Sequence, residues 1–269
     1  MTYCGEVSIK FRELFNLANV ECTHFIRTTE EHHKKSVQFL WNKLFDNGFI
    51  YKSTYKGYYS VNDETFVPEI LIRTNENGEK ISIESGHKLE WHEEDNYMFR
   101  LSSVQDKLVD WFTNKLVIRP SNFYSVLKAE INNASNIEDI SISRSKSRLK
   151  WGIDVPNDPD QIIYVWFDAL INYLTVSGYP NHLAQWPPCH LIGKDIIKFH
   201  AIYWPSFLIA ADLEPPNLIY CHSHWLYEDS KMSKSKGNVV DPFECISKFT
   251  SDGIRYFLLK EGTPHCDSS

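Results

Sequence analysis

The sequence predicts an α/β fold that combines a parallel sheet in its C-terminal half with a small β-rich insert in its N-terminal half. Two short apolar runs, 189–193 and 217–221, flank an apolar helical stretch from 195 to about 211. A strand, a helix and a strand within about 30 residues indicate a βαβ unit and therefore parallel strands. Between residues 49 and 100, β-branched and aromatic runs surround the turn sequence Asn77-Gly78, which predicts the insert.

A helix is predicted to precede this insert. Thr28 and Glu31 have capping-box spacing at its start, and Gly48 ends it. Between these points, apolar residues recur at helical intervals: Val37, Leu40, Trp41, Leu44 and Phe45. One face of this helix is therefore expected to pack on a core.

Within the insert, we expect strands at 49–51 and 58–61 around Gly57, and a hairpin of 70–72 with 80–83. Two helices should follow, a shorter one after Ser121 and one from about Ser102 with an apolar face of Val104, Leu108, Trp111, Phe112 and Leu116. In residues 143–150 a cation recurs at every second position, beginning with Arg144.

Composition limits the class of protein. The 269 residues are 42% hydrophobic and 23% charged, as in an ordinary soluble globular protein, and the formal net charge is −7. A polyanion must therefore bind at a local basic patch. The six cysteines form no Cys-x-x-Cys pair, which disfavours a zinc ribbon, and no apolar run reaches the roughly 18 residues of a membrane span. No targeting segment is visible.

The most specific short motif is Lys-Met-Ser-Lys-Ser, called here the lysine motif. It precedes a helix that Asp241 should cap, with Pro242 in the first turn. A cationic loop at the ligand-binding edge of a parallel sheet suits a polyphosphate, whose developing charge lysines stabilise. The alternative is a solvated basic loop without a ligand. The motif comprises Lys231, Met232, Ser233, Lys234 and Ser235.

The lysine motif resembles the second signature of class I aminoacyl-tRNA synthetases. Four further segments resemble the methionine enzyme of that class, in its bacterial and organellar branch: 25–30, 163–169, 192–196 and 199–205. The resemblance extends from about residue 3 to residue 265. It implies a methionine–tRNA ligase that activates methionine with ATP, supplied as its Mg²⁺ complex, and transfers it to tRNA(Met).

The resemblance also implies roles for individual residues. Lys234 would contact the ATP phosphates while Lys231 supports the loop, Gly193 and Asp195 would approach the ribose and adenine, and His222 and Trp225 would lie near the adenine. The residues expected to line or back the methionine pocket are Trp166, Ala169, Tyr173, Ile196, His200 and Trp204.

Aromatic rings suit a thioether ligand, because sulfur gains from contact with them. Each of these residues alone could equally be an ordinary core residue. Arg144 is expected to support the pocket or the tRNA acceptor end through phosphate contacts, although the cation repeat could also be an exposed strand face.

The sequence departs from the family's pattern: it contains no His-x-Gly-His, and the turn near 62–64 has no cysteines for a zinc knuckle. The resemblance therefore implies an incomplete Rossmann-type fold made of its second half. We expect residues 1–48 to end the first half, 49–100 to form the insert, 101–150 the return helices and basic segment, and 151–269 the second half. A structural zinc is not expected.

Three interpretations of activity follow. The 269 residues are expected to be a segment of an active enzyme and to be inactive alone. Alternatively, they form a non-catalytic binding module, or belong to a synthetase for another amino acid. The subtype implies the mitochondrial matrix, with the cytoplasm as the alternative, and a monomeric enzyme that does not engage a membrane.

Overall fold

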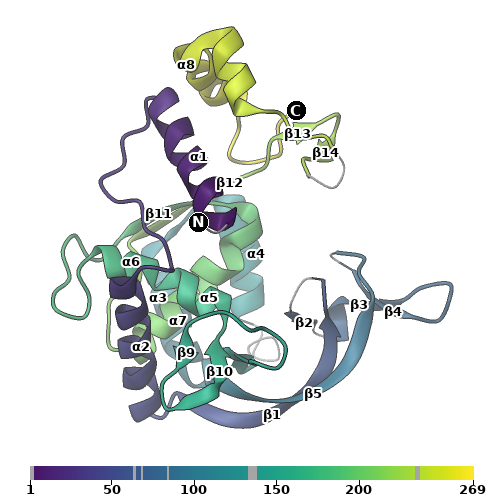
Figure 1. The fold of residues 1–269 in the computed structure, drawn as a ribbon, viewed down its shortest axis with the longest axis vertical. Helices are drawn as coiled ribbons and strands as arrows, with labels where there is room; N and C mark the ends of the chain where they lie inside the picture. The colour runs from purple at the N-terminus through teal and green to yellow at the C-terminus, as the bar shows by residue number, and fades with distance from the viewer. Residues whose placement is uncertain (1–2, 63–64, 68, 84, 133–137, 234–236) are drawn as a thin grey trace.

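The computed structural model describes most of the chain and shows an α/β core between a helical pair and a curved β-ribbon (Figure 1). The described residues are 3–62, 65–67, 69–83, 85–132, 138–233 and 237–269. The predicted α/β class, with a parallel sheet and antiparallel strands, is confirmed.

The parallel sheet has three strands in the order β11 (Cys189–Gly193), β12 (Leu218–His222) and β6 (Ile118–Arg119). Strands β11 and β12 pair in parallel, so the predicted βαβ unit is confirmed. The sequence did not predict β6, because two residues are too short for a periodic pattern. One face of the sheet is open: Leu191 on β11 is 74% exposed and Tyr220 on β12 is 39% exposed.

The connection between β11 and β12 is not the single helix that the sequence predicts. It contains a 3-10 turn η4 (Lys194–Ile196), a π-helix η5 (Phe199–Tyr203) and helix α7 (Trp204–Ala210). Pro205 has no N–H to donate to the carbonyl four residues earlier, so the α-helical ladder is interrupted there.

Five helices pack around this sheet (Figure 1). They are α2 (Glu31–Asp46), α3 (Gln105–Lys115), α4 (Ser121–Asn132), α5 (Val165–Leu170) and α6 (Asn172–Val176), and the 3-10 turn η2 (Leu101–Val104) precedes α3. Helix α2 buries the predicted apolar face except Phe45, which is exposed. The predicted capping box is wrong: Glu30 is the N-cap residue and its side chain makes no capping hydrogen bond. Leu116 lies beyond α3 with a positive φ of 43° and is exposed.

The insert is a curved antiparallel ribbon of two long strands, β1 (Ile50–Ser60) and β5 (Leu89–Phe99) (Figure 1). The two strands predicted on either side of Gly57 are therefore one strand, and β5 was not predicted. The predicted hairpin at Asn77-Gly78 is confirmed. The other elements of the insert region are β2 (Thr65–Val67), η1 (Glu69–Leu71), β3 (Ile72–Thr74), β4 (Lys80–Ser82) and β7 (Ile140–Ser141).

A second antiparallel sheet leads from the insert to the C-terminal half. Its strands lie in the order β8 (Ser143–Ser145), β10 (Asp158–Ile163) and β9 (Asp154–Val155). Helix α5 begins two residues after β10, so the apolar run 162–166 ends a strand and starts a helix.

Two helices stand apart from this core, side by side at the top of Figure 1. Helix α1 (Tyr3–Leu17) was not predicted, and α8 (Pro242–Glu261) begins at the predicted Asp241 cap, whose side chain accepts a hydrogen bond from the Phe243 N–H at 2.8 Å. Arg255 joins the two by donating to the Ala18 carbonyl at 3.1 Å. In the described residues, α1 buries only Gly5 and α8 buries none. Of the described helices, none has the length and apolarity to cross a membrane.

Candidate active site

The carboxyl ends of β11 and β12 bring together three of the residues predicted to bind ATP. Gly193 and His222 are partners in the parallel register. A Cβ atom on Gly193 would lie 2.8 Å from Asp195 Oδ1 and 3.7 Å from His222 Cε1, so a larger residue here would displace the Asp195 side chain. Burial favours a higher pKa for Asp195, but the hydrogen bond from His224 and the positive charges of His224 and Lys231 lower it on balance. The edge therefore carries a carboxylate beside a glycine-lined gap.

The C-terminal tail binds to this edge. Lys194 Nζ lies 2.6 Å from Asp267 Oδ1, which also accepts the His224 N–H at 3.0 Å. The hydrogen bond from Lys194 lowers the pKa of Asp267. Trp225, also predicted to lie near the adenine, forms a β-bridge to Ser268 and its ring centroid is 5.3 Å from that of Phe257 on α8. The tail thus fixes the segment between β12 and the lysine motif.

The lysine motif begins in a short hairpin of β13 (Leu226–Tyr227) and β14 (Ser230–Lys231). Lys231 is exposed, and Met232 and Ser233 are half-buried. Asn238 holds the base of the loop: its Oδ1 accepts the Ser233 N–H at 2.8 Å and its Nδ2 donates to Ser230 Oγ at 3.1 Å. Lys234 and Ser235 lie outside the described residues, so the expected contact of Lys234 stays a prediction.

A cluster of aromatic and histidine side chains lies next to the strand edge and contains four of the predicted methionine-pocket residues. His200 Nδ1 is 2.9 Å from the Ile196 carbonyl, and His200 Nε2 is 2.8 Å from the Tyr173 hydroxyl. Because a carbonyl only accepts, Nδ1 carries the proton of a neutral imidazole and Nε2 accepts from Tyr173. Burial lowers the pKa of His200, which keeps this neutral form, and burial raises the pKa of Tyr173. Trp204 is fully buried, with its ring centroid 5.9 Å from that of Tyr173.

His190 belongs to the same cluster, although the sequence did not identify it. The Trp204 indole donates to His190 Nε2 at 3.1 Å, and the His190 and Tyr173 ring centroids are 4.2 Å apart. Burial, reinforced by His200, lowers the pKa of His190 to about 3. His190 was hidden in a run read as an apolar strand. The signal that could have found it is its place on the inward face of that strand, which it shares with Ile192.

The other two predicted pocket residues lie on α5. The Trp166 ring stacks on Phe199 of the π-helix, with centroids 3.7 Å apart and planes 9° from parallel. Ala169 is half-buried, and its carbonyl accepts from Asn172 Nδ2 at 2.6 Å. The π-helix thus lies against α5 through Trp166 and against α6 through Tyr173. These elements bring the predicted methionine-pocket residues together beside the strand edge.

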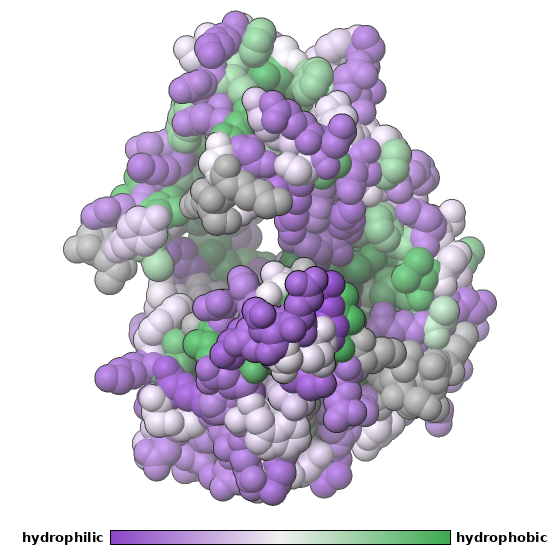
Figure 2. Space-filling view, turned by 90° about the vertical axis from the view of Figure 1, so that its right-hand side faces the viewer, coloured by the Kyte–Doolittle hydropathy of each residue, from purple (hydrophilic) through white to green (hydrophobic). Residues whose placement is uncertain are grey.

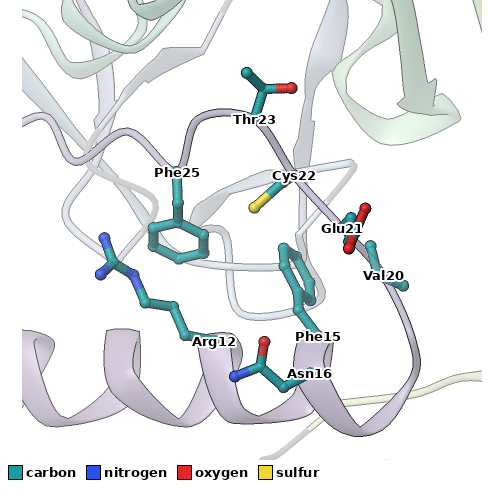
Figure 3. A pocket seen from close by; sticks show the side chains of 8 residues that line it. All are labelled: Arg12, Phe15, Asn16, Val20, Glu21, Cys22, Thr23 and Phe25. Carbon is teal, nitrogen blue, oxygen red and sulfur yellow. The ribbon is translucent and has the colours of Figure 1, made fainter.

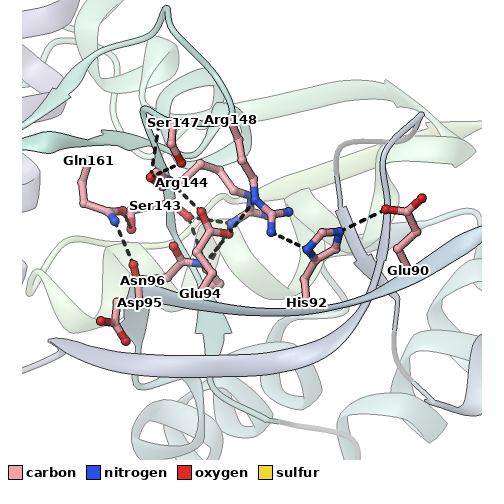
Figure 4. A network of polar contacts seen from close by, with 12 residues as sticks. Glu90, His92, Glu94, Asp95, Asn96, Ser143, Arg144, Ser147, Arg148 and Gln161 are labelled. Atoms are coloured by element: carbon pink, nitrogen blue, oxygen red, sulfur yellow. Dashed lines mark hydrogen bonds and ion pairs between the residues drawn. The ribbon is translucent and has the colours of Figure 1, made fainter.

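Arg144 lies apart, beside the insert, in a network of polar contacts (Figure 4). Its side chain is buried, which makes the exposed-face interpretation wrong for this residue. It donates to Ser141 Oγ at 3.0 Å and to the Ser143 carbonyl at 2.7 Å, and stacks 4.2 Å over the Tyr164 ring. Within the described part of the chain, its Nε is buried without a hydrogen-bond partner. A guanidinium in this state retains the capacity to bind an anion.

Two of the hollows on the surface can be compared with the predicted site. Figure 2 shows one between the upper part of the molecule, which holds α8, and the lower part, which holds the β-ribbon, with apolar surface beside the opening. The other, of about 400 Å³, lies between α1 and the segment that follows it, where Arg12 sits 4.7 Å over the Phe25 ring (Figure 3). The second hollow contains none of the predicted site residues. Among described side chains, no group of three or more His, Cys, Asp or Glu could hold a metal ion.

A family model described as tRNA synthetases class I (M) matches residues 1–269. The chain belongs to the class I tRNA synthetase family, in its methionine group. The family resemblance of the lysine motif and its companion segments is therefore confirmed.

Curated members of this family are similar along the whole chain. The chain is 49% identical to the mitochondrial methionine–tRNA ligase of Xenopus laevis over 272 residues, which cover 99% of the chain and 48% of that protein. It is 48% identical to the human mitochondrial ligase, covering 98% of the chain and 46% of that protein. The chain thus spans about half the length of these relatives.

Solved structures of the family agree. The methionyl-tRNA synthetase of Mycobacterium tuberculosis bound by methionyl-adenylate superposes with a TM-score of 0.87 at 38% identity, over 96% of this chain and 51% of that one. The free enzyme gives a TM-score of 0.85 at 35% identity, over 99% and 52%.

Proposed function

We propose that this chain is the part of a methionine–tRNA ligase that holds methionine beside ATP. The methionine carboxylate attacks the α-phosphorus of ATP, with Mg²⁺ accompanying the nucleotide, and pyrophosphate leaves. A ribose hydroxyl at the 3′ end of tRNA(Met) then attacks the methionyl carbonyl, and AMP leaves. The observation that carries this proposal is the Tyr173–His200–Ile196 hydrogen-bonded cluster next to the strand ends at Gly193 and His222.

The strand edge is the proposed nucleotide side. Gly193 leaves room for the nucleotide, Asp195 accepts hydrogen bonds from the ribose or adenine, and His222 and Trp225 flank the adenine. Lys231 and Lys234 carry positive charge toward the phosphates, where such groups stabilise the charge that develops in the transition state. The close approach at Gly193 supports this assignment.

The aromatic cluster is the proposed methionine side. Trp166, Tyr173 and Trp204 offer rings to the thioether, which sulfur favours. Ala169 and Ile196 complete an apolar wall, and His200 orients Tyr173 as a neutral acceptor. A pocket of uncharged groups suits an uncharged side chain, because burying an unpaired charge is costly.

Arg144 is the proposed anion site, beside the insert and the start of α5. Its unbonded Nε–H and its position over Tyr164 support a role toward a phosphate of ATP or of the tRNA acceptor end. We propose no more specific contact for it.

The exposed sheet face and the exposed helix α8 support an incomplete Rossmann-type fold, in which this half packs against further strands. Parallel sheets are covered on both faces in complete folds, whereas Leu191 and Tyr220 are exposed here and α8 buries none of its described residues. We propose that residues 1–48, 49–100, 101–150 and 151–269 are successive parts of that arrangement. We also propose that the 269-residue polypeptide alone catalyses exchange at background level.

The location follows from the relatives, whose names place them in mitochondria. We propose the mitochondrial matrix and a monomeric enzyme.

Methionine-dependent ATP–pyrophosphate exchange by the complete protein, as the cell makes it, tests this function. We expect exchange with methionine and none with isoleucine or cysteine. Exchange with one of the latter alone would identify a synthetase for another amino acid. No exchange with any amino acid, in a protein that still binds methionine, would favour the non-catalytic binding module.

A further inference from the structure

One buried histidine on α2, His33, joins this helix to the helix pair α5–α6. Its side chain is 0% exposed, Nε2 lies 2.6 Å from Asp168 Oδ1, and Nδ1 lies 2.9 Å from Thr175 Oγ1. Its partners are 135 and 142 residues away along the chain. The contact is therefore purely tertiary and ties the N-terminal helix to the second half.

The His33 ring has a hydrogen-bond partner at each nitrogen. The Asp168 carboxylate can only accept, so it accepts from His33 Nε2–H. Nδ1 shares a hydrogen bond with the Thr175 hydroxyl, which is also 3.1 Å from the Ile171 carbonyl. The ring is therefore held on two sides, and its hydrogen bond to Asp168 has a carboxylate acceptor.

Among the charged groups around His33, Asp168 is the one that faces the ring. On α2 itself, His32 faces solvent within 3.5 Å of Glu30, and Lys34 pairs with Glu31 at 2.6 Å. From α5, Asp168 faces the ring, and from α6 the uncharged Thr175 does. The pair is thus a local, buried interaction.

Asp168 and Thr175 lie among the proposed methionine-pocket residues. Asp168 follows Trp166 by two positions and precedes Ala169 directly, in the first turn of α5. Thr175 is two residues beyond Tyr173 on α6. One imidazole ring therefore contacts both helices that carry the pocket wall.

Other contacts between α2 and this segment are less directional. The Trp41 and Phe167 rings meet with centroids 5.4 Å apart, and Ser36 Oγ donates to the Tyr179 carbonyl at 2.8 Å. Apolar packing permits small rotations of α5, whereas charged hydrogen bonds weaken steeply when their angles change. The His33 contacts are therefore the ones suited to fix the rotation of α5 and α6.

We propose that His33, held by Asp168 and Thr175, is a positioning residue that fixes the methionine pocket from outside. This inference rests on the proposed function. It makes α2 a support for the pocket without touching the substrate.

Kinetics of the complete protein test the inference. We expect His33→Ala to lower kcat/KM for methionine by about 10- to 100-fold, because small displacements of a positioned group have effects of this size. The loss should lie mainly in the methionine KM, with the ATP KM within about twofold of wild type. His33→Gln, which keeps one N–H donor, should recover part of the loss in kcat/KM. Asp168→Asn should show a partial loss similar to that of His33→Gln.

Ser36→Ala is the matched control, since it removes another buried hydrogen bond from α2 but none to α5. We expect it to lower the unfolding temperature and leave the methionine KM unchanged. If His33→Ala lowers the unfolding temperature and leaves the methionine KM unchanged too, the inference is overturned while the proposed function stands. A wild-type protein without methionine-dependent exchange would overturn the proposed function, and the inference with it.

The contact with Asp168 has a readout of its own. In ¹⁵N-histidine NMR spectra at neutral pH, the His33 signals, assigned by their loss in His33→Gln, should show a protonated Nε2. An unprotonated Nε2 would overturn the proposed hydrogen bond to Asp168.

Discussion

The two sides of the proposed active site differ in burial and in charge. The side chains of the methionine side are buried or half-buried, uncharged and internally hydrogen-bonded, with His190 and His200 held neutral by their surroundings. The nucleotide side is more exposed and carries polar contacts of charged groups, such as Lys194 with Asp267 and Asp195 with His224. Buried polar contacts are insensitive to salt, whereas exposed ion pairs are screened. The two substrates should therefore respond differently to the same changes of solvent and sequence.

The largest difference should come from the lysine motif. We expect Lys234→Ala in the complete protein to lower the adenylation rate by about 100-fold, because it removes stabilisation of transition-state charge, and to raise the methionine KM much less. Single-turnover adenylation measures the rate, and steady-state pyrophosphate exchange with methionine varied measures the methionine KM. The exposed Lys248 provides a matched Lys→Ala control that should leave the rate unchanged. The reverse pattern, a high methionine KM with a normal rate, would mean that the lysine acts in substrate binding.

On the methionine side, Tyr173→Phe should raise the methionine KM about tenfold, because His200 Nε2 loses its donor and a buried unpaired polar atom costs about 1–3 kcal/mol. The ATP KM should change little. Steady-state exchange with each substrate varied in turn measures this, and Tyr220→Phe on the exposed sheet face is the control. Equal increases of both KM values would contradict the separation of the two sides.

The neutral histidine cluster predicts a pH dependence of stability. The folded pKa of His190 is about 3, below the roughly 6.5 of a free histidine, so the unfolded chain takes up a proton first as the pH falls. The contribution of neutral His190 to the free energy of unfolding is complete above about pH 6.5. It is lost as the pH falls from there to about pH 3, by roughly 1 kcal/mol per pH unit. Urea unfolding at pH 7 and pH 5 should show a shallower dependence in His190→Gln than in wild type or in the exposed-site control His24→Gln. An unchanged slope would contradict a neutral His190.

The smallest effect should come from the exposed ion pair of the tail. Asp267→Asn should raise the ATP KM by less than about threefold, because exposed pairs contribute little. The difference from wild type should shrink further in high salt. A large effect that persists in salt would mean that the tail contacts the nucleotide directly.

The sequence predicted the parts of the fold that have strong periodicity or specific turn chemistry. The βαβ unit, the Asn77-Gly78 hairpin and the Asp241 cap are confirmed. Helix α1 and strand β5 were not predicted, because both leave many side chains in solvent and lack a one-sided apolar pattern. Such elements depend on contacts that local sequence does not encode.

The site was predicted unevenly for a similar reason. Motif resemblance led to His200 and Tyr173, and the structure joins them in a hydrogen bond. Neither His190 nor His33 carries a local motif, and each meets its partners only when distant segments fold together. For Arg144 the sequence left an exposed strand face open beside a role at the pocket or acceptor end, and tertiary packing buries the side chain.

The π-helix at Phe199–Tyr203 makes this stretch unusually sensitive to chain length. Each residue of an α-helix turns the chain by roughly 100°. Deleting one residue from the wide turn would restore a regular helix, but it would also rotate His200 away from Tyr173 while Trp204 stayed in the core. Related proteins can therefore exchange side chains along this turn more readily than they can gain or lose a single position in it.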